Sequence, residues 1–168
     1  MAKLPPHLAP LGKYAKSKPP KFHFGWVLDN PDILLDIGKS LGVQPRKHEE
    51  DHEDHEDHDS DDDSEDDEES DCTVSMTDVW MRMDALQAVS KELELKNEPY
   101  LARVICPGKP NPRVLMISLV ENYSLKDGFT RGIDIQNLMK YFDFKTGPMW
   151  YLDGYFWMWD STRFWCSC

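Results

Sequence analysis

A dense acidic segment between residues 49 and 71 limits what this chain can fold into. The segment holds 17 of the chain's 31 Asp and Glu residues and contains no Lys or Arg. Between Val43 and Cys72 the sequence has no aromatic residue and no Ala, Val, Ile, Leu or Met. Like-charge repulsion and the lack of apolar side chains predict that residues 45–71 are a disordered insertion within a folded domain. Such an insertion costs a fold little, because loop-closure entropy grows only logarithmically with length.

The rest of the chain divides into a basic arm and an electrically neutral domain. Residues 1–21 contain five prolines, five lysines and no acidic residue, which predicts a flexible arm. Residues 22–44 and 72–168 are expected to form one domain, since roughly 110–120 residues suffice for a hydrophobic core. The net charge of −12 therefore belongs to the insertion and not to the fold.

The sequence carries no signal for export or membrane attachment. The N-terminus lacks the apolar run of a secretory signal, and Ala2 excludes N-myristoylation. No apolar stretch approaches the ~18 residues that a membrane-spanning helix needs. The four cysteines, at positions 72, 106, 166 and 168, are then expected to be reduced thiols. We therefore expect an intracellular protein, cytoplasmic or nuclear, with no membrane partner.

Hydrophobic periodicity predicts one helix before the insertion and one after it. Residues 22–28 precede them and read as a short strand or an extended anchoring segment. The sequence Asp29-Asn30-Pro31 is a helix-start signal, and apolar residues follow at helical spacing until Gly42. After the insertion, Thr77 or Asp78 can cap a second helix, whose apolar residues recur every three or four positions.

The C-terminal half reads as strands around one short helix. Residues 100–106 and 113–120 are rich in β-branched side chains and are joined by a Pro- and Gly-rich turn. Asp134 can cap a helix, and Asp153-Gly154 between aromatic runs predicts a type I′ hairpin over residues 149–160. The order α-α-β-β-α-β-β predicts an α+β fold, a small single domain with helices packed on an antiparallel sheet.

A repeat in the insertion suggests metal binding. The triplet Glu-Asp-His occurs three times between residues 50 and 58, and imidazole and carboxylate both bind divalent transition metals. A flexible segment, however, lacks the surrounding hydrogen bonds that orient metal ligands. Weak divalent-metal binding is therefore an alternative to a simple solvated low-complexity segment. The candidate ligands are His48, His52, His55 and His58.

The same insertion suggests modification and basic partners. Ser60 and Ser64 each have an acidic residue three positions later, as acid-directed kinases require, and phosphorylation would strengthen the negative field. A polyanion of this density attracts basic proteins and makes nucleic-acid binding unfavourable. Residues 49–71 are therefore either a surface for basic partners or a solubilising spacer.

Aromatic residues gather near the C-terminus, where eight of the chain's 19 lie between residues 150 and 165. Both faces of the predicted hairpin carry large apolar side chains, and a domain of this size covers one face more easily than two. One face is therefore a candidate interface for a protein partner or a second copy of the chain; in the alternative, helices cover both. The candidate interface residues are Trp150, Tyr151, Tyr155, Phe156, Trp157 and Trp159.

The sequence contains no catalytic signature. Only His7 and His23 lie outside the acidic segment, so a Ser–His or Cys–His mechanism would have to use His23. A histidine between two phenylalanines is more often a structural residue. The end of the chain, Cys166-Ser167-Cys168, provides only half of a zinc site. We assign no catalytic residue and no cofactor.

These features predict a non-enzymatic, intracellular protein-interaction domain whose acidic segment engages basic partners. The first alternative is a small enzyme or ligand-binding domain with a pocket under the aromatic hairpin. The second alternative is weak divalent-metal binding by the His/acid repeat. No motif carries a resemblance to a known family.

Overall fold

In the described residues, seven helices and strands follow one another in the order β-α-α-β-β-α-β. The computed structural model describes residues 2–14, 18–46, 75–127 and 129–156. The elements are β1 (Phe22–Val27), α1 (Ile33–Ser40), α2 (Met76–Glu92), β2 (Tyr100–Ile105), β3 (Arg113–Glu121), α3 (Gly132–Tyr141) and β4 (Met149–Asp153). Three single 3-10 turns lie at Pro6–Leu8, Gly12–Tyr14 and Leu125–Asp127.

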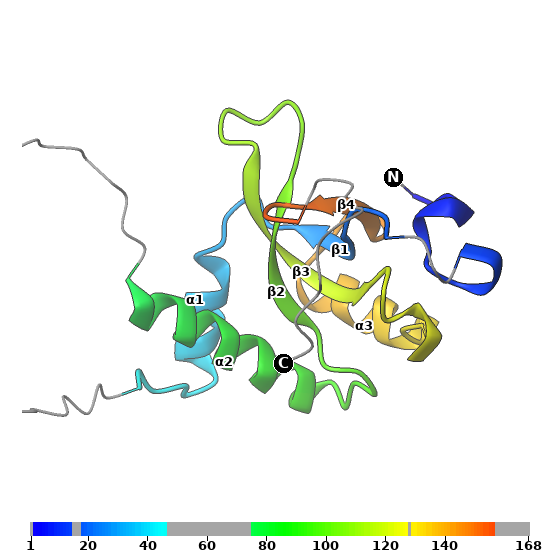
Figure 1. Ribbon diagram of the computed structural model, residues 1–168. Coiled ribbons are helices and arrows are strands. Elements are labelled where there is room, and N and C mark those ends of the chain that lie inside the picture. The colour runs from blue at the N-terminus through cyan, green and yellow to red at the C-terminus, as the bar shows by residue number, and fades with distance from the viewer. Residues whose placement is uncertain (1, 15–17, 47–74, 128, 157–168) are drawn as a thin grey trace, which may run out of the picture.

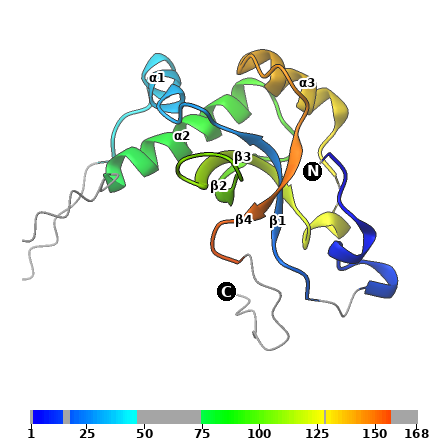
Figure 2. The ribbon, with the colours of Figure 1, turned by 90° about the horizontal axis from the view of Figure 1, so that it is seen from above.

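The four strands pair antiparallel and close into a small barrel in the order β1-β3-β2-β4. The ladder that completes the ring is short, because β2 and β4 share only the pairs Val104–Asp153 and Ile105–Leu152. Figures 1 and 2 show that the three helices lie on one side of the strands, with α1 against α2. The predicted α+β class, with helices packed on an antiparallel sheet, is confirmed.

Strand β1 has two chemically different faces. Phe22, Phe24 and Trp26 point toward the helices and belong to the main hydrophobic core. The alternate residues, which include His23 and Val27, face the interior of the barrel, as the two-residue period of a strand requires. The main core also contains Leu34, Leu86, Val89, Ile117, Leu138 and Trp150. A smaller apolar cluster inside the barrel consists of Ala102, Val104 and Met116, with Val27, Val114 and Tyr151 packed against it.

Gly25 lets β1 approach β3 closely. The register between the two strands shifts between Phe24 and Gly25, which marks a β-bulge. A Cβ atom at this position would lie 1.9 Å from the carbonyl oxygen of Ile117. Only glycine therefore fits here, and the bulge depends on it.

The aromatic hairpin predicted around Asp153-Gly154 is not formed in the described residues. Leu152, expected opposite Tyr155, pairs instead with Phe22 and Ile105, and residues 154–156 form a bend. The physical reason is that β4 finds both of its partners in strands already present, so its backbone groups need no following strand. The predicted order also omitted β1 as a strand, and residues 157–160 of the predicted hairpin lie outside the described residues.

Two predicted helix caps are displaced. Helix α2 begins at Met76 after Ser75, just before Thr77 and Asp78. Helix α3 begins at Gly132 after Arg131, so that Asp134 lies inside its first turn. Asp134 is buried and accepts hydrogen bonds from the Arg131 guanidinium at 2.7 and 2.9 Å, which explains why it does not cap the helix.

The N-terminal arm, predicted to be flexible, makes specific contacts with the domain. The fully buried Asn122 donates hydrogen bonds to the carbonyl oxygens of Leu8 at 2.8 Å and Pro20 at 3.0 Å. Its side-chain oxygen accepts from the Phe22 amide at 2.9 Å. Leu4 and Leu8 also pack against the main core. The periodicity of the arm gave no sign of these contacts, because they depend on a polar residue 102 positions after Pro20 and 114 positions after Leu8.

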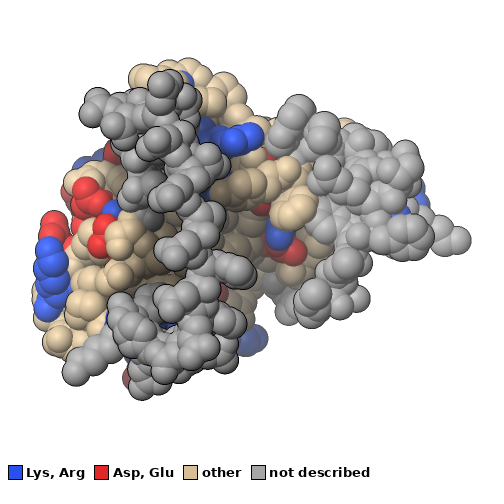
Figure 3. All heavy atoms as spheres, turned by 60° about the vertical axis from the view of Figure 1, so that its left-hand side comes forward, with Lys and Arg blue, Asp and Glu red and all other residues tan. Residues whose placement is uncertain are grey.

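Ion pairs connect α2 to the residues on either side of α1. Arg46 forms a two-bond pair with Asp84 at 2.6 and 3.0 Å, and Arg82 contacts Asp32 at 2.7 Å. On the face shown in Figure 3, basic and acidic side chains of described residues lie interspersed with uncharged ones. Most of the predicted insertion lies outside the described residues, since the gap covers positions 47–74.

Candidate functional site

Each of the four strands contributes one polar side chain to a cluster inside the barrel. The cluster consists of His23 from β1, Tyr100 from β2, Ser118 from β3 and Asp153 from β4. His23 lies at its centre, with Nε2 at 2.6 Å from Asp153 Oδ2 and Nδ1 at 3.0 Å from the Tyr100 hydroxyl. The Ser118 hydroxyl lies 3.3 Å from the same Nδ1. We call this set the four-strand polar cluster.

The four-strand polar cluster contains the residue types of a serine hydrolase, but it is sealed. A serine, a histidine and an aspartate in contact can activate the serine hydroxyl as a nucleophile. Here Ser118 is 0 % exposed and His23 is 2 % exposed. Tyr100, 37 % exposed, is the member that reaches the surface, and its hydroxyl points inward to His23. The arrangement is suited to joining strands rather than to admitting a substrate.

The ionisation of the cluster follows from its burial. Burial raises the pKa of Tyr100 to about 12, so its phenol stays neutral at physiological pH. Burial acts to raise the pKa of Asp153 as well, but the hydrogen bonds from His23 and from two backbone amides outweigh it. The pKa of Asp153 is therefore lowered below its ordinary value, and the residue is a carboxylate.

The second oxygen of Asp153 fixes the bend that follows β4. Its Oδ1 accepts hydrogen bonds from the backbone amides of Tyr155 and Phe156, both at 2.7 Å. The carbonyl oxygen of Phe156 in turn accepts from the backbone amide of Lys21 at 3.0 Å, and the amide of Gly154 donates to the carbonyl oxygen of Arg103 at 2.8 Å. The bend is thus held from three directions, while the side chains of Tyr155 and Phe156 are 56 % and 40 % exposed.

A cleft lies at the other end of the barrel. The four-strand polar cluster occupies the end where β1 and β2 begin and β3 and β4 finish. The cleft, with a volume of about 540 Å³, is lined by the last residues of β1, the loop after it, Cys106, Lys109, residues 142–147 and Tyr151. We call it the barrel-mouth cleft, since Val27 and Tyr151 belong both to it and to the apolar cluster inside the barrel.

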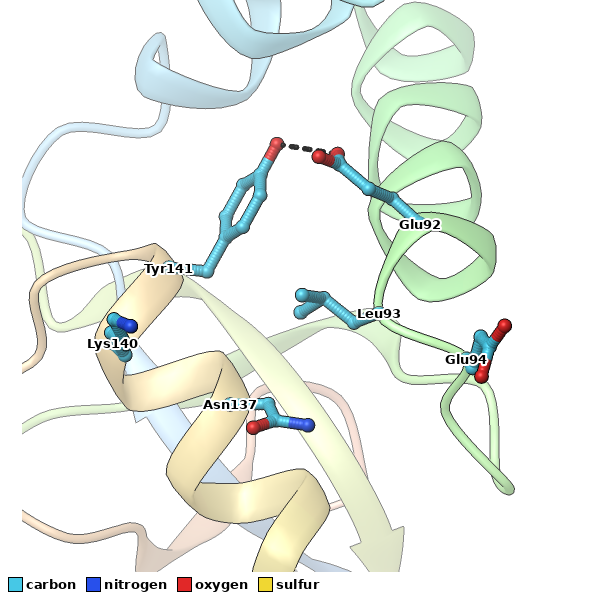
Figure 4. Close-up of a pocket in the computed structure, with 6 residues that line it drawn as sticks. All are labelled: Glu92, Leu93, Glu94, Asn137, Lys140 and Tyr141. Carbon is cyan, nitrogen blue, oxygen red and sulfur yellow. Dashed lines mark hydrogen bonds between the residues drawn. The ribbon is translucent and has the colours of Figure 1, made fainter.

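A second groove lies between the end of α2 and α3, and its lining residues are drawn in Figure 4. The Tyr141 hydroxyl donates to Glu92 across the groove at 3.1 Å. Glu94, Asn137 and Lys140 complete the polar lining, with Leu93 as its single apolar member. The groove offers little apolar surface to a ligand, so we regard it as a junction between two helices.

The structure separates the predicted interface residues. Trp150 is buried in the main core against Phe24, with the ring centres 5.2 Å apart. Tyr151 is half-buried in the barrel-mouth cleft, and Tyr155 and Phe156 are exposed at the opposite end.

Trp157 and Trp159 lie outside the described residues. So do the predicted metal ligands His48, His52, His55 and His58 and the phosphorylation candidates Ser60 and Ser64. Within the described residues, no group of three or more His, Cys, Asp or Glu side chains could hold a metal ion.

Sequence reasoning singled out His23 and missed its partners. Asp153 was interpreted as a turn residue, and Tyr100 and Ser118 as ordinary strand positions. The available signal was the alternation in β1, which places His23 opposite the aromatic face and so predicts a polar partner inside the sheet. That signal says nothing about which residue supplies the partner.

Comparisons with known proteins identify no relative. The chain matches no protein-family model, and neither a curated protein nor a solved structure is significantly similar to it. Across the described residues, no helix combines the length and the apolar character needed to cross a lipid bilayer.

Proposed function

We propose that this chain is a non-enzymatic protein-interaction domain that contacts a basic protein through two surfaces. One is the aromatic bend formed by Tyr155 and Phe156, and the other is the acidic insertion, residues 49–71. The observation that carries the proposal is the exposure of two aromatic rings on a backbone that Asp153 holds in place.

A fixed backbone makes exposed aromatic rings effective in binding. Tyrosine and phenylalanine provide a large contact area, and interface residues of this kind are enriched where binding energy concentrates. A binding surface that is already ordered loses less conformational entropy when the partner arrives. Exposed rings forgo the stabilisation that burial would give the isolated domain, so their exposure fits a surface that another protein covers.

The enclosure of the four-strand polar cluster supports the non-enzymatic part of the proposal. A nucleophile must reach the reacting atom, and Ser118 is fully buried. His23 shares its Nδ1 atom between Tyr100 and Ser118, and its Nε2 atom faces Asp153. All the hydrogen-bonding capacity of the ring is therefore used within the fold.

The acidic insertion supplies the charge that selects the partner. Its 17 acidic residues without a single Lys or Arg favour a Lys- and Arg-rich protein and disfavour nucleic acid. Phosphorylation of Ser60 and Ser64 would strengthen this preference. We place the interaction in the cytoplasm or the nucleus, where Cys106, a free thiol in the described part of the chain, would stay reduced.

The proposal is tested with purified core histones as the basic probe and polylysine as a featureless control. Three full-length variants are compared with the wild type at roughly 0.15 M salt, where screening is moderate. They are a neutral Gly/Ser replacement of residues 49–71, the double variant Tyr155→Ser/Phe156→Ser, and Ile133→Ser, an equally exposed apolar residue on α3 (54 %).

Each variant has a distinct expected result. The neutral replacement should weaken histone binding at least about tenfold and also abolish polylysine binding, since both depend on charge. The double aromatic variant should weaken histone binding by roughly 5- to 30-fold, as hot-spot losses do, without affecting polylysine. Ile133→Ser should bind like the wild type. Equal histone binding by the wild type and the double aromatic variant would remove the aromatic bend from the proposal, and equal binding by the neutral replacement would remove the insertion.

A further inference from the structure

We propose that the barrel-mouth cleft binds an uncharged, ring-containing small molecule that carries a hydrogen-bond acceptor. This site is independent of the proposed protein contacts, since it lies at the opposite end of the barrel from Tyr155 and Phe156. Four observations carry the proposal: an opening in the barrel, rigid walls, fully paired charges and an available phenol.

The opening arises because β1 extends past β4. The ladder between β1 and β4 ends at Gly25–Met149, whereas the ladder between β1 and β3 continues to Val27–Met116. The barrel is therefore open beside the last residues of β1, and Val27 and Tyr151 form an apolar floor that continues into the interior. The volume of about 540 Å³ falls within the range of small-molecule sites. The mouth of a barrel is also a common position for such sites.

Stacked aromatic rings hold the wall of the cleft in place. The rings of Trp26 and Phe144 stack at 4.8 Å with an angle of 8° between their planes, and Phe142 stacks on Phe144 at 5.4 Å. The indole nitrogen of Trp26 donates to the carbonyl oxygen of Thr146 at 2.8 Å. These contacts tie the loop between α3 and β4 to strand β1. The cleft is therefore formed before a ligand enters, which reduces the entropic cost of binding.

The charged groups of the lining are already paired. Lys109 contacts Asp29 at 2.6 Å across the rim, and Lys145 contacts Asp143 at 2.5 Å. The lining thus carries two positive and two negative charges in two pairs. The lining therefore offers a charged ligand no unpaired opposite charge, and burying the ligand's charge against the apolar floor without a partner is unfavourable. An uncharged ligand avoids this cost.

Tyr151 supplies the polar contact that would orient a ligand. Its hydroxyl, unlike those of Tyr100 and Tyr141, makes no hydrogen bond within the part of the chain that the structure describes. Burial raises the pKa of Tyr151, and so do the nearby Cys106 and Asp29. The phenol therefore keeps its proton and can donate a hydrogen bond to a carbonyl or hydroxyl oxygen of the ligand.

Three probes with one ring system test the proposal on the full-length chain. Indole-3-acetamide is neutral and carries a carbonyl acceptor, indole-3-acetate is anionic, and tryptamine is cationic. Binding is followed by backbone amide chemical shifts in NMR titrations. The variants are Tyr151→Phe, which removes the donor, and Tyr141→Phe, a matched control in the groove between α2 and α3.

The proposal predicts that the acetamide binds at least about fivefold more tightly than either charged probe, with shifts at Val27, Cys106 and Tyr151. Tyr151→Phe should weaken its binding by about fivefold, the usual effect of one hydrogen bond, and Tyr141→Phe should not. In a chain with Cys72, Cys166 and Cys168 replaced by Ser, the acetamide should also slow alkylation of Cys106. The proposal is overturned if none of the probes binds at millimolar concentration, or if a charged probe binds as tightly. It is equally overturned if the shifts lie elsewhere or if both tyrosine variants behave alike.

Discussion

The imidazole of His23 and the carboxylate of Asp153 lie 2.6 Å apart inside the barrel, although 130 positions separate them in the chain. They come from β1 and β4, the first and last strands of the described residues, which also pair through their backbones. Tyr100 and Ser118 bring β2 and β3 to the same point. Since β2 and β4 share only two residue pairs, these side-chain bonds strengthen the part of the ring where the backbone ladder is shortest.

Removing the Asp153 carboxylate should strongly destabilise the fold. Asp153→Ala leaves His23 without its partner in a buried site and removes the acceptor for two backbone amides. Breaking a buried pair from one side costs about 3–5 kcal/mol, which urea unfolding would measure. The control is Lys145→Ala, which removes the exposed pair with Asp143 and should cost nothing measurable. Equal stabilities of the two variants would show that the His23–Asp153 pair is not needed to keep the barrel closed.

The elevated pKa of Tyr100 should make stability fall in alkali. The folded protein holds this pKa at about 12, above the ordinary value of 10. Folding therefore favours the neutral phenol. The resulting stabilisation of the fold is complete below pH 10 and is lost as the pH rises toward 12. Between pH 8 and pH 11, the urea unfolding midpoint should fall further for the wild type than for Tyr100→Phe. Parallel curves for the two proteins would contradict the elevated pKa.

Patterns local in sequence predicted most of the elements. The three- and four-residue spacing of apolar side chains located α1 and α2, and β-branched runs located β2 and β3. Each of these signals depends on neighbours within one element, so it survives without knowledge of the tertiary structure. Strand β3 is apolar on both faces of its run and pairs with both β1 and β2.

Features that depend on distant partners could not be predicted. Asp153-Gly154 is a strong hairpin signal, but β4 pairs with β1 and β2, and Asp153 uses its side chain for His23 and the bend. Trp150 was expected at an interface and lies in the core, because β1 covers it with Phe24. The barrel-mouth cleft arises from unequal lengths of two ladders, a property of the register that no local pattern encodes.

Gly25→Ala should disrupt the barrel. The added Cβ would lie 1.9 Å from the carbonyl oxygen of Ile117, and a backbone atom cannot move aside without breaking the ladder between β1 and β3. We expect a loss of about 3 kcal/mol or more in thermal or urea unfolding. Gly132→Ala is the matched control, since a Cβ there meets open space. A mild effect of Gly25→Ala, similar to that of the control, would mean that the bulge can relax.

Asn122→Ala should release the N-terminal arm. The variant removes the acceptor for the Phe22 amide and the donors to Leu8 and Pro20, so one buried and two partly buried backbone groups lose their partner. Each buried group left unpaired costs about 1–3 kcal/mol. Cleavage by trypsin after Lys13 should become faster than in the wild type under native conditions. If the cleavage rate stayed the same while stability fell, Asn122 would support β1 without holding the arm.

Replacing residues 48–71 with a short Gly/Ser linker should leave the domain folded. The contacts that join α1 to α2 lie within the described residues on either side: Arg46 with Asp84, Arg82 with Asp32, and the Arg46 guanidinium over the Trp80 ring at 4.7 Å. None of them requires the insertion, and shortening a loop lowers its closure entropy only slightly.

Thermal unfolding should therefore remain cooperative, with a midpoint at or slightly above that of the wild type because a dense cluster of like charges is removed. A broad transition would show that the insertion is part of the folded unit, and the boundaries at residues 44 and 72 would then be wrong. The variant Arg46→Ala in the shortened chain completes the test, since it should lower the midpoint only if the packing of α1 on α2 is what maintains the fold.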